Sequence, residues 1–166
     1  MTSSEKPLIV TEANSDTEWS GDSLGAVPTV HIAPETGFAV LFEAKVLADI
    51  SCGISLDVLR NQMARNIDVM LDANPRLSDP MRRRVPERTC FVLLTPEVFH
   101  QNKESRLYGW LYNEYTRQDS TLLNQQLPHR SGEDLATVPP RLGWLTWEDC
   151  NAVQSDACWW LAGGTA

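Results

Sequence analysis

The sequence predicts a single α/β domain in which helices flank a central mixed β-sheet. Stretches rich in β-branched and aromatic residues alternate with stretches of helical periodicity, a pattern typical of this fold class. The chain has 166 residues, the size of about one domain. Hydrophobic residues make up 42% of it and charged residues 22%, as in a folded protein. We expect the domain to span 24–155, after a polar segment at 1–23 and before a tryptophan-containing tail at 156–166.

A β-hairpin is predicted to begin the sheet. Residues 26–32 and 38–46 have strand-like composition, and the turn signal Ala33-Pro-Glu-Thr-Gly37 separates them. Pro28 favours an edge or a bulge position in the first strand, because proline donates no hydrogen bond to a neighbour. The second strand is apolar on both faces and is therefore predicted to be central and covered on both sides.

A long amphipathic helix is predicted over 54–72. Its apolar residues recur at spacings of three and four, Ser55 offers a cap at its start, and Asn74-Pro75 would end it. The apolar stripe consists of Leu56, Leu59, Met63, Ile67 and Met70.

The remaining elements follow from shorter patterns. Residues 89–95 form an apolar run that predicts a buried strand, and 142–146 predicts the last strand. Short helices are expected at 96–102 and 147–153, and a longer amphipathic helix at 104–118. The tyrosines of this longer helix could stack on bases, but their spacing favours a place in the core. The polar segment 128–140 predicts a loop.

Charge and composition exclude several classes of function. The net charge is −8, which disfavours passive coating of nucleic acid, since the protein's field repels phosphate. No apolar run is long enough for a membrane span, so we expect no membrane association. The first residues lack the features of a secretory leader, so we expect a cytoplasmic protein. The four cysteines lack zinc-site spacing and predict free thiols.

The residues that point to chemistry are Glu43 and Lys45, at the end of the second predicted strand. They share one face of that strand, because side chains alternate. Burying a carboxylate and an ammonium costs free energy unless a partner compensates each of them. Hairpin geometry places Asp22 opposite about residue 47, close to Lys45. Two carboxylates beside a lysine suit a divalent cation that prefers oxygen, chiefly Mg²⁺, with Mn²⁺ as the alternative.

The order Asp22, hairpin, Glu43-Ala-Lys45 and polar-faced helix resembles the PD-(D/E)xK nuclease superfamily over about residues 20–95. The resemblance implies a restriction-endonuclease-like core and hydrolysis of DNA, with RNA as the alternative substrate. It implies that Asp22 and Glu43 bind the metal, that Lys45 assists catalysis, and that Gln62 matches an auxiliary glutamine of the lambda-exonuclease-like members. The chain departs from the family at Asn66, where an aromatic residue is expected, and in the short stretch available for a first core helix.

Basic residues near this site are candidates for contact with the nucleic acid backbone. Arg60 lies beside Gln62 on the predicted helix and could bind a phosphate. Arg82, Arg83 and Arg84 form a basic run that either contacts phosphate or is a solvated loop.

Simpler interpretations stand beside these. Glu43 and Lys45 could be a surface pair, Asp22 a turn residue, and Gln62 a solvated side chain. The missing first helix and the negative charge are also compatible with a catalytically degenerate nuclease-fold protein that acts as a binding or scaffold subunit. Trp159 and Trp160, in the C-terminal tail, suggest contact with a second copy or a partner protein.

Overall fold

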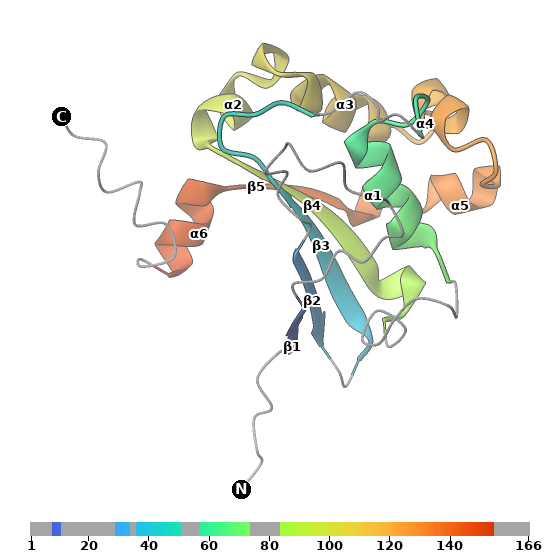
Figure 1. Ribbon diagram of the computed structural model, residues 1–166, viewed down its shortest axis with the longest axis horizontal. Coiled ribbons are helices and arrows are strands. Elements are labelled where there is room, and N and C mark those ends of the chain that lie inside the picture. Colours follow the sequence, from blue (N-terminus) through green and yellow to red (C-terminus); the bar gives the residue numbers. More distant parts are fainter. Residues whose placement is uncertain (1–7, 11–28, 34–35, 51–56, 74–83, 155–166) are drawn as a thin grey trace, which may run out of the picture.

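The computed structural model describes residues 8–10, 29–33, 36–50, 57–73 and 84–154, and they form a five-stranded mixed sheet with helices (Figure 1). The strand order follows the sequence, β1-β2-β3-β4-β5. β1, β2 and β3 are antiparallel, whereas β3, β4 and β5 are parallel. The predicted α/β class with a mixed sheet is therefore confirmed. The strands are β1 Leu8–Val10, β2 Thr29–Ala33, β3 Phe38–Ala44, β4 Thr89–Thr95 and β5 Leu142–Thr146.

The helices lie between and after the parallel strands in sequence. In Figure 1, α1, α3, α4 and α5 gather on one side of the sheet, while α6 lies apart from them. Among the helices that the structure describes, none has both the length and the apolar composition needed to cross a bilayer. The α-helices are α1 Gln62–Leu71, α2 Glu97–Gln101, α3 Leu107–Tyr115, α4 Thr121–Gln126, α5 Gly132–Ala136 and α6 Trp147–Val153. Single 3-10 turns occur at Pro86–Arg88, Lys103–Ser105 and Pro139–Arg141.

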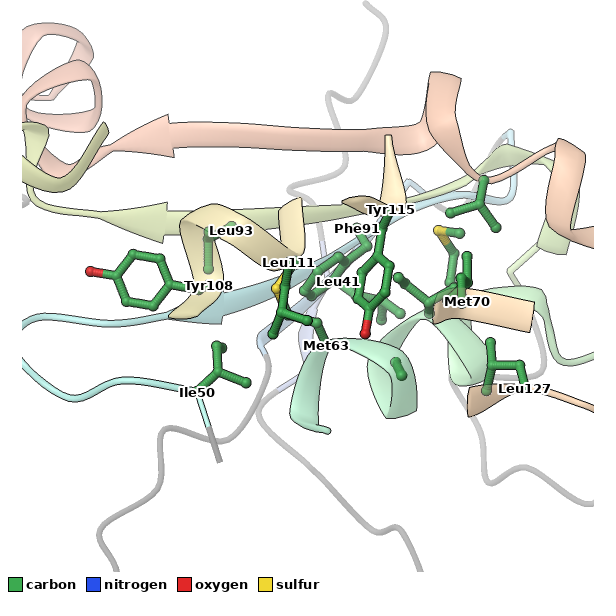
Figure 2. Packing of buried hydrophobic residues seen from close by; sticks show 14 of the residues in the cluster. Leu41, Ile50, Met63, Met70, Phe91, Leu93, Tyr108, Leu111, Tyr115 and Leu127 are labelled. Atoms are coloured by element: carbon green, nitrogen blue, oxygen red, sulfur yellow. The ribbon is translucent and has the colours of Figure 1, made fainter. Parts of the chain in front are cut away.

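The hydrophobic core lies between the sheet and these helices. Figure 2 shows apolar side chains of α1 and α3 packed together with Leu41 of β3 and Phe91 of β4. Tyr108 and Tyr115 are fully buried in this core, and the burial of Leu111 and Tyr115 agrees with the helical spacing of these two residues. Their neighbours from the same helices are Met63, Ala64, Ile67, Met70 and Leu111.

The predicted hairpin is confirmed, but the positions of its strands differ from expectation. β2 pairs antiparallel with β3, from Thr29 opposite Phe42 to Ala33 opposite Phe38. β2 is not an edge strand, because β1 pairs with its other side. The short apolar run at 8–10, which we assigned to a polar segment before the domain, therefore belongs to the sheet. Pro28 lies outside the described residues.

The two faces of the second strand of the hairpin differ in burial. Ala39, Leu41 and Glu43 are buried toward the helices. On the opposite face Phe38 is 42% exposed, and the side chains at 40 and 42 are half-buried. Among the described residues, the face toward the helices is therefore the more deeply covered one.

The first long helix is shorter than the periodicity predicted. α1 begins at Gln62 with Asn61 as its N-cap, and the described residues 57–61 before it are not helical. Leu59 is 72% exposed and does not belong to the apolar stripe. The proposed cap Ser55 lies outside the described residues.

The other predicted elements agree with the structure except in the polar region. β4, α2, β5 and α6 lie where the sequence predicted them, and the helix expected at 104–118 is confirmed as the shorter α3. The segment 128–140 is not all loop, since α5 lies within it, and α4 was not predicted.

Candidate functional site

Glu43 and Lys45 lie where β3 ends, at the boundary between the antiparallel and parallel halves of the sheet. Alternation along the strand directs Glu43 to the same face as Ala39 and Leu41, which is the face that α1 covers. Lys45 follows the last residue of β3, and its backbone N–H donates to the Leu94 carbonyl at 2.8 Å. The carbonyl of Lys45 accepts a hydrogen bond from Trp147 Nε1 at 3.0 Å. The main chain at this point is therefore held from two sides.

The two side chains form a buried ion pair. Lys45 Nζ lies 3.1 Å from Glu43 Oε1, and the side chains are 7% and 0% exposed. The alternative of a surface pair is therefore wrong. Removing two opposite charges from water is costly, and close pairing recovers only part of that cost unless further hydrogen bonds satisfy both groups.

Two amides of α1 supply such bonds. Lys45 Nζ donates to Gln62 Oε1 at 2.8 Å, and Asn66 Nδ2 donates to Glu43 Oε2 at 2.9 Å. Gln62 and Asn66 are four residues apart, so they lie one turn apart on the same side of the helix. The structure thus brings Glu43, Lys45 and Gln62 together, and Gln62 is not merely solvated. Sequence reasoning treated Asn66 as a departure from the family pattern and, like Gln62, as a residue that could be solvated, although its spacing from Gln62 indicated the shared face.

Burial and charge act in opposite directions on Glu43. Desolvation raises its pKa above the ordinary value of 4.5. This effect is larger than the lowering by the charge and close contact of Lys45, by the Asn66 hydrogen bond and by the charge of Arg65. The carboxylate therefore holds its proton more tightly than a solvated glutamate. A cation bound to it would favour the ionised form, because the two charges attract.

The donor set fits a divalent cation in part. Glu43 Oε1 is buried and faces Lys45 Nζ at 3.1 Å, outside the geometry of a hydrogen bond, so at least one of its two lone pairs has no donor among the described residues. Carboxylate oxygen is the ligand type that Mg²⁺ prefers. Within the described ranges no three acidic, histidine or cysteine side chains form a cluster that could hold a metal.

Asp22, the predicted second ligand, lies outside the described residues. The register does show where the chain that follows it enters the sheet. Thr29, the first residue of β2, pairs with Phe42, the residue directly before Glu43. The described part of β2 thus begins at the same end of the sheet as Glu43 and Lys45.

The predicted phosphate-binding arginines have other partners. Arg60 forms ion pairs with Asp57 and Asp68, each at 2.6 Å, so its guanidinium is engaged by two carboxylates. Asp68 also pairs with Arg130 and His129, so this cluster joins α1 to the segment that follows α4.

The prediction that Arg84 contacts nucleic acid is wrong for the position that the structure gives it. Arg84 is 5% exposed, and its guanidinium donates to the carbonyls of Val69, Met70 and Asp72. The Val69 carbonyl also accepts the Asp72 N–H at 3.2 Å, and Arg84 adds donors at the helix end, where carbonyls lack intrahelical partners. Arg82 and Arg83 lie outside the described residues.

Comparisons with models of protein families, with curated protein sequences and with solved structures find no match to this chain. The arrangement of Glu43, Lys45, Gln62 and Asn66 is therefore the observation from which a function is argued.

Proposed function

We propose that this protein is a Mg²⁺-dependent nuclease that hydrolyses DNA phosphodiester bonds on a restriction-endonuclease-like core. The observation that carries the proposal is the meeting of Glu43, Lys45 and Gln62 at the end of β3, with ion-pair and hydrogen-bond distances of 3.1 and 2.8 Å. A carboxylate with an unused lone pair beside a held ammonium is the pairing that metal-assisted hydrolysis needs.

Each side chain has a separate task in the proposed reaction. Glu43, together with Asp22, holds the metal, which when bound polarises the phosphodiester and lowers the pKa of a bound water. Lys45 orients the attacking water or stabilises the negative charge that develops on the phosphate. Gln62 fixes the Lys45 ammonium through its Oε1. The attacking water gives up a proton to solvent and its oxygen forms a bond to phosphorus, the P–O bond to the departing strand breaks, and the leaving oxygen takes up a proton from solvent.

The burial of the pair sets a condition on this proposal. Glu43 is fully buried and Lys45 is 7% exposed, so a polymer must gain access to this corner before hydrolysis. The same burial supports a second candidate function, that of a binding or scaffold subunit in which the ion pair only stabilises the fold. Metal binding distinguishes the two candidate functions, since a scaffold subunit needs no metal ion.

The test measures metal binding and cleavage with the full-length chain. Calorimetry with Mg²⁺ or Mn²⁺ is followed by assays on supercoiled, linear and single-stranded DNA and on RNA, each with the metal or with EDTA. We expect metal-dependent cleavage of DNA. Glu43→Gln and Lys45→Ala should each reduce cleavage by at least about 100-fold, the usual effect of losing a group that acts on the transition state.

Glu104→Gln is the matched control, because Glu104 is an exposed carboxylate outside the site. It should cleave like the wild type, and thermal melts should show that all three variants fold. Cleavage that persists in either site variant removes that residue from the mechanism. A folded wild type that binds no metal at millimolar concentration and cleaves no nucleic acid contradicts the nuclease proposal and favours the scaffold subunit.

A further inference from the structure

We propose that Asn66 is a positioning residue that holds the Glu43 carboxylate with Oε1 directed toward the metal. This inference rests on the proposed function, because it assigns a role within the same site. The contact that carries it is the 2.9 Å hydrogen bond from Asn66 Nδ2 to Glu43 Oε2. The two oxygens of the carboxylate are therefore not equivalent.

The two oxygens of Glu43 have different surroundings. Oε2 receives the Asn66 amide, while Oε1 faces Lys45 at 3.1 Å and receives no hydrogen bond of good geometry from the described residues. Without a donor at Oε2, the carboxylate would be free to turn both oxygens toward the ammonium. Asn66 opposes that rotation, so that one lone pair stays available beside the lysine. In metal sites, partners of this kind fix the orientation of a ligand and strengthen the binding of the ion.

Asn66 is suited to this role because α1 is fixed at both ends. Asn61 caps the start of the helix and also donates to Tyr115 and Gln126, while Arg84 satisfies the carbonyls at its end. Met63 and Ile67, on either side in the sequence, are fully buried. A donor that projects from such a helix has a defined position relative to β3, which a donor on a loop would lack.

The test compares Asn66→Leu, which keeps the size of the side chain but removes the donor, with Asn66→His, whose Nδ1–H can replace the amide. Mn²⁺ affinity is measured by calorimetry, and stability by thermal melts. We expect Asn66→Leu to weaken Mn²⁺ binding about 10- to 100-fold, the usual effect of losing such a partner. Asn66→His should recover most of the affinity. Asn113→Leu, at an exposed position of α3, is the matched control and should bind as the wild type does.

A folded Asn66→Leu variant with wild-type Mn²⁺ affinity overturns the inference, as does an Asn66→His variant that binds no better than Asn66→Leu. If Asn66→Leu does not fold, Asn66→Ser, which is too short to reach Glu43, takes its place with the same expectation.

A second measurement separates this inference from the proposed function. The side-chain amide resonance of Asn66 should shift in Glu43→Gln when followed by NMR without metal, because the charged acceptor is lost. A wild type that binds no metal and cleaves nothing contradicts the nuclease proposal, yet this shift would still support the positioning contact. An unshifted Asn66 resonance would contradict the contact even in an active nuclease.

Discussion

Burial of Glu43 and Lys45 carries a large desolvation free energy, and the surrounding side chains show how that free energy is reduced. Each charged group has one amide partner from α1 in addition to its oppositely charged neighbour. Such hydrogen bonds to charged groups contribute about 1.5–3 kcal/mol each. The pair is therefore a specific constraint on how α1 sits against β3, more than a source of net stability.

The raised pKa of Glu43 predicts how stability depends on pH. Because the folded state holds the proton more tightly than the unfolded chain, Glu43 favours folding most below its unfolded value of 4.5. That contribution is lost as the pH rises through the higher pKa of the folded state. The double variant Glu43→Gln, Lys45→Met lacks this titration. Thermal melts between pH 4 and 8 should show the wild type losing stability relative to the double variant as the pH rises.

A difference in melting temperature that stays constant from pH 4 to 8 would contradict this prediction. The Glu104→Gln variant provides the control, because its exposed carboxylate should leave the pH profile of the wild type unchanged.

Among single residues, the sequence identified Glu43, Lys45 and Gln62 because alternation and motif spacing determine which face each one occupies. The sequence did not show that Arg60 pairs with carboxylates instead of binding phosphate, since Asp57 and Asp68 come close to it only in the folded chain. Arg84 was misjudged for a related reason. A run of arginines suggests a solvated surface, but one arginine can be buried where it donates hydrogen bonds to the carbonyls at a helix end, as Arg84 does.

At the scale of elements, α1 is the helix on which the site depends. Its apolar residues at 63, 67 and 70 were predicted correctly, but periodicity alone extended it too far toward the N-terminus. Asn61 is the N-cap and sets the first residue of the helix. Its side chain accepts from the Ala64 N–H at 3.0 Å, and its Nδ2 is directed to Tyr115 and Gln126. The long-range bonds that favour this cap over Ser55 are not visible in a local pattern.

Asn61→Ala should lower the free energy of unfolding by about 2–4 kcal/mol, since it removes a helix cap and leaves buried polar partners unsatisfied. Asn61→Ser keeps a capping oxygen but cannot reach α3 and α4, so it should recover only the smaller part of this loss. Urea denaturation measures both effects. Asn113→Ala, at an exposed position of α3, is the control. Equal urea midpoints for Asn61→Ala and the wild type would show that this cap does not anchor α1.

The short helices α4 and α5 were harder to predict than the strands. Each is too brief for a clear apolar stripe, and each begins at a serine that caps it, Ser120 and Ser131. Leu123 and Leu135 are their buried residues, and both pack into the common core. Tertiary packing therefore stabilises these helices more than local periodicity does. The strands β3 and β4 were predicted well because each contributes a nearly continuous apolar run, whereas the three-residue β1 was assigned to a polar segment.

At the scale of the whole molecule, the net charge of −8 opposes any approach of DNA. Arg60 and Arg84, two of the predicted phosphate ligands, are engaged in contacts within the protein. The nuclease proposal therefore predicts that DNA binding depends on a divalent ion at the site.

Fluorescence anisotropy with labelled DNA tests this dependence. In EDTA we expect no measurable affinity, and in Ca²⁺, a non-catalytic substitute for Mg²⁺, binding should appear and weaken in Glu43→Gln. Glu104→Gln should behave as the wild type. Tight DNA binding in EDTA would contradict the prediction and would indicate a basic surface outside the described residues.

The anchoring of Lys45 has a mechanical consequence. Its amide is held by Leu94 and its carbonyl by Trp147, so the α-carbon is fixed between β4 and α6. Because Glu43 and Gln62 hold the ammonium, the side chain is located from both of its ends, and a displacement of α6 would be passed directly to the site.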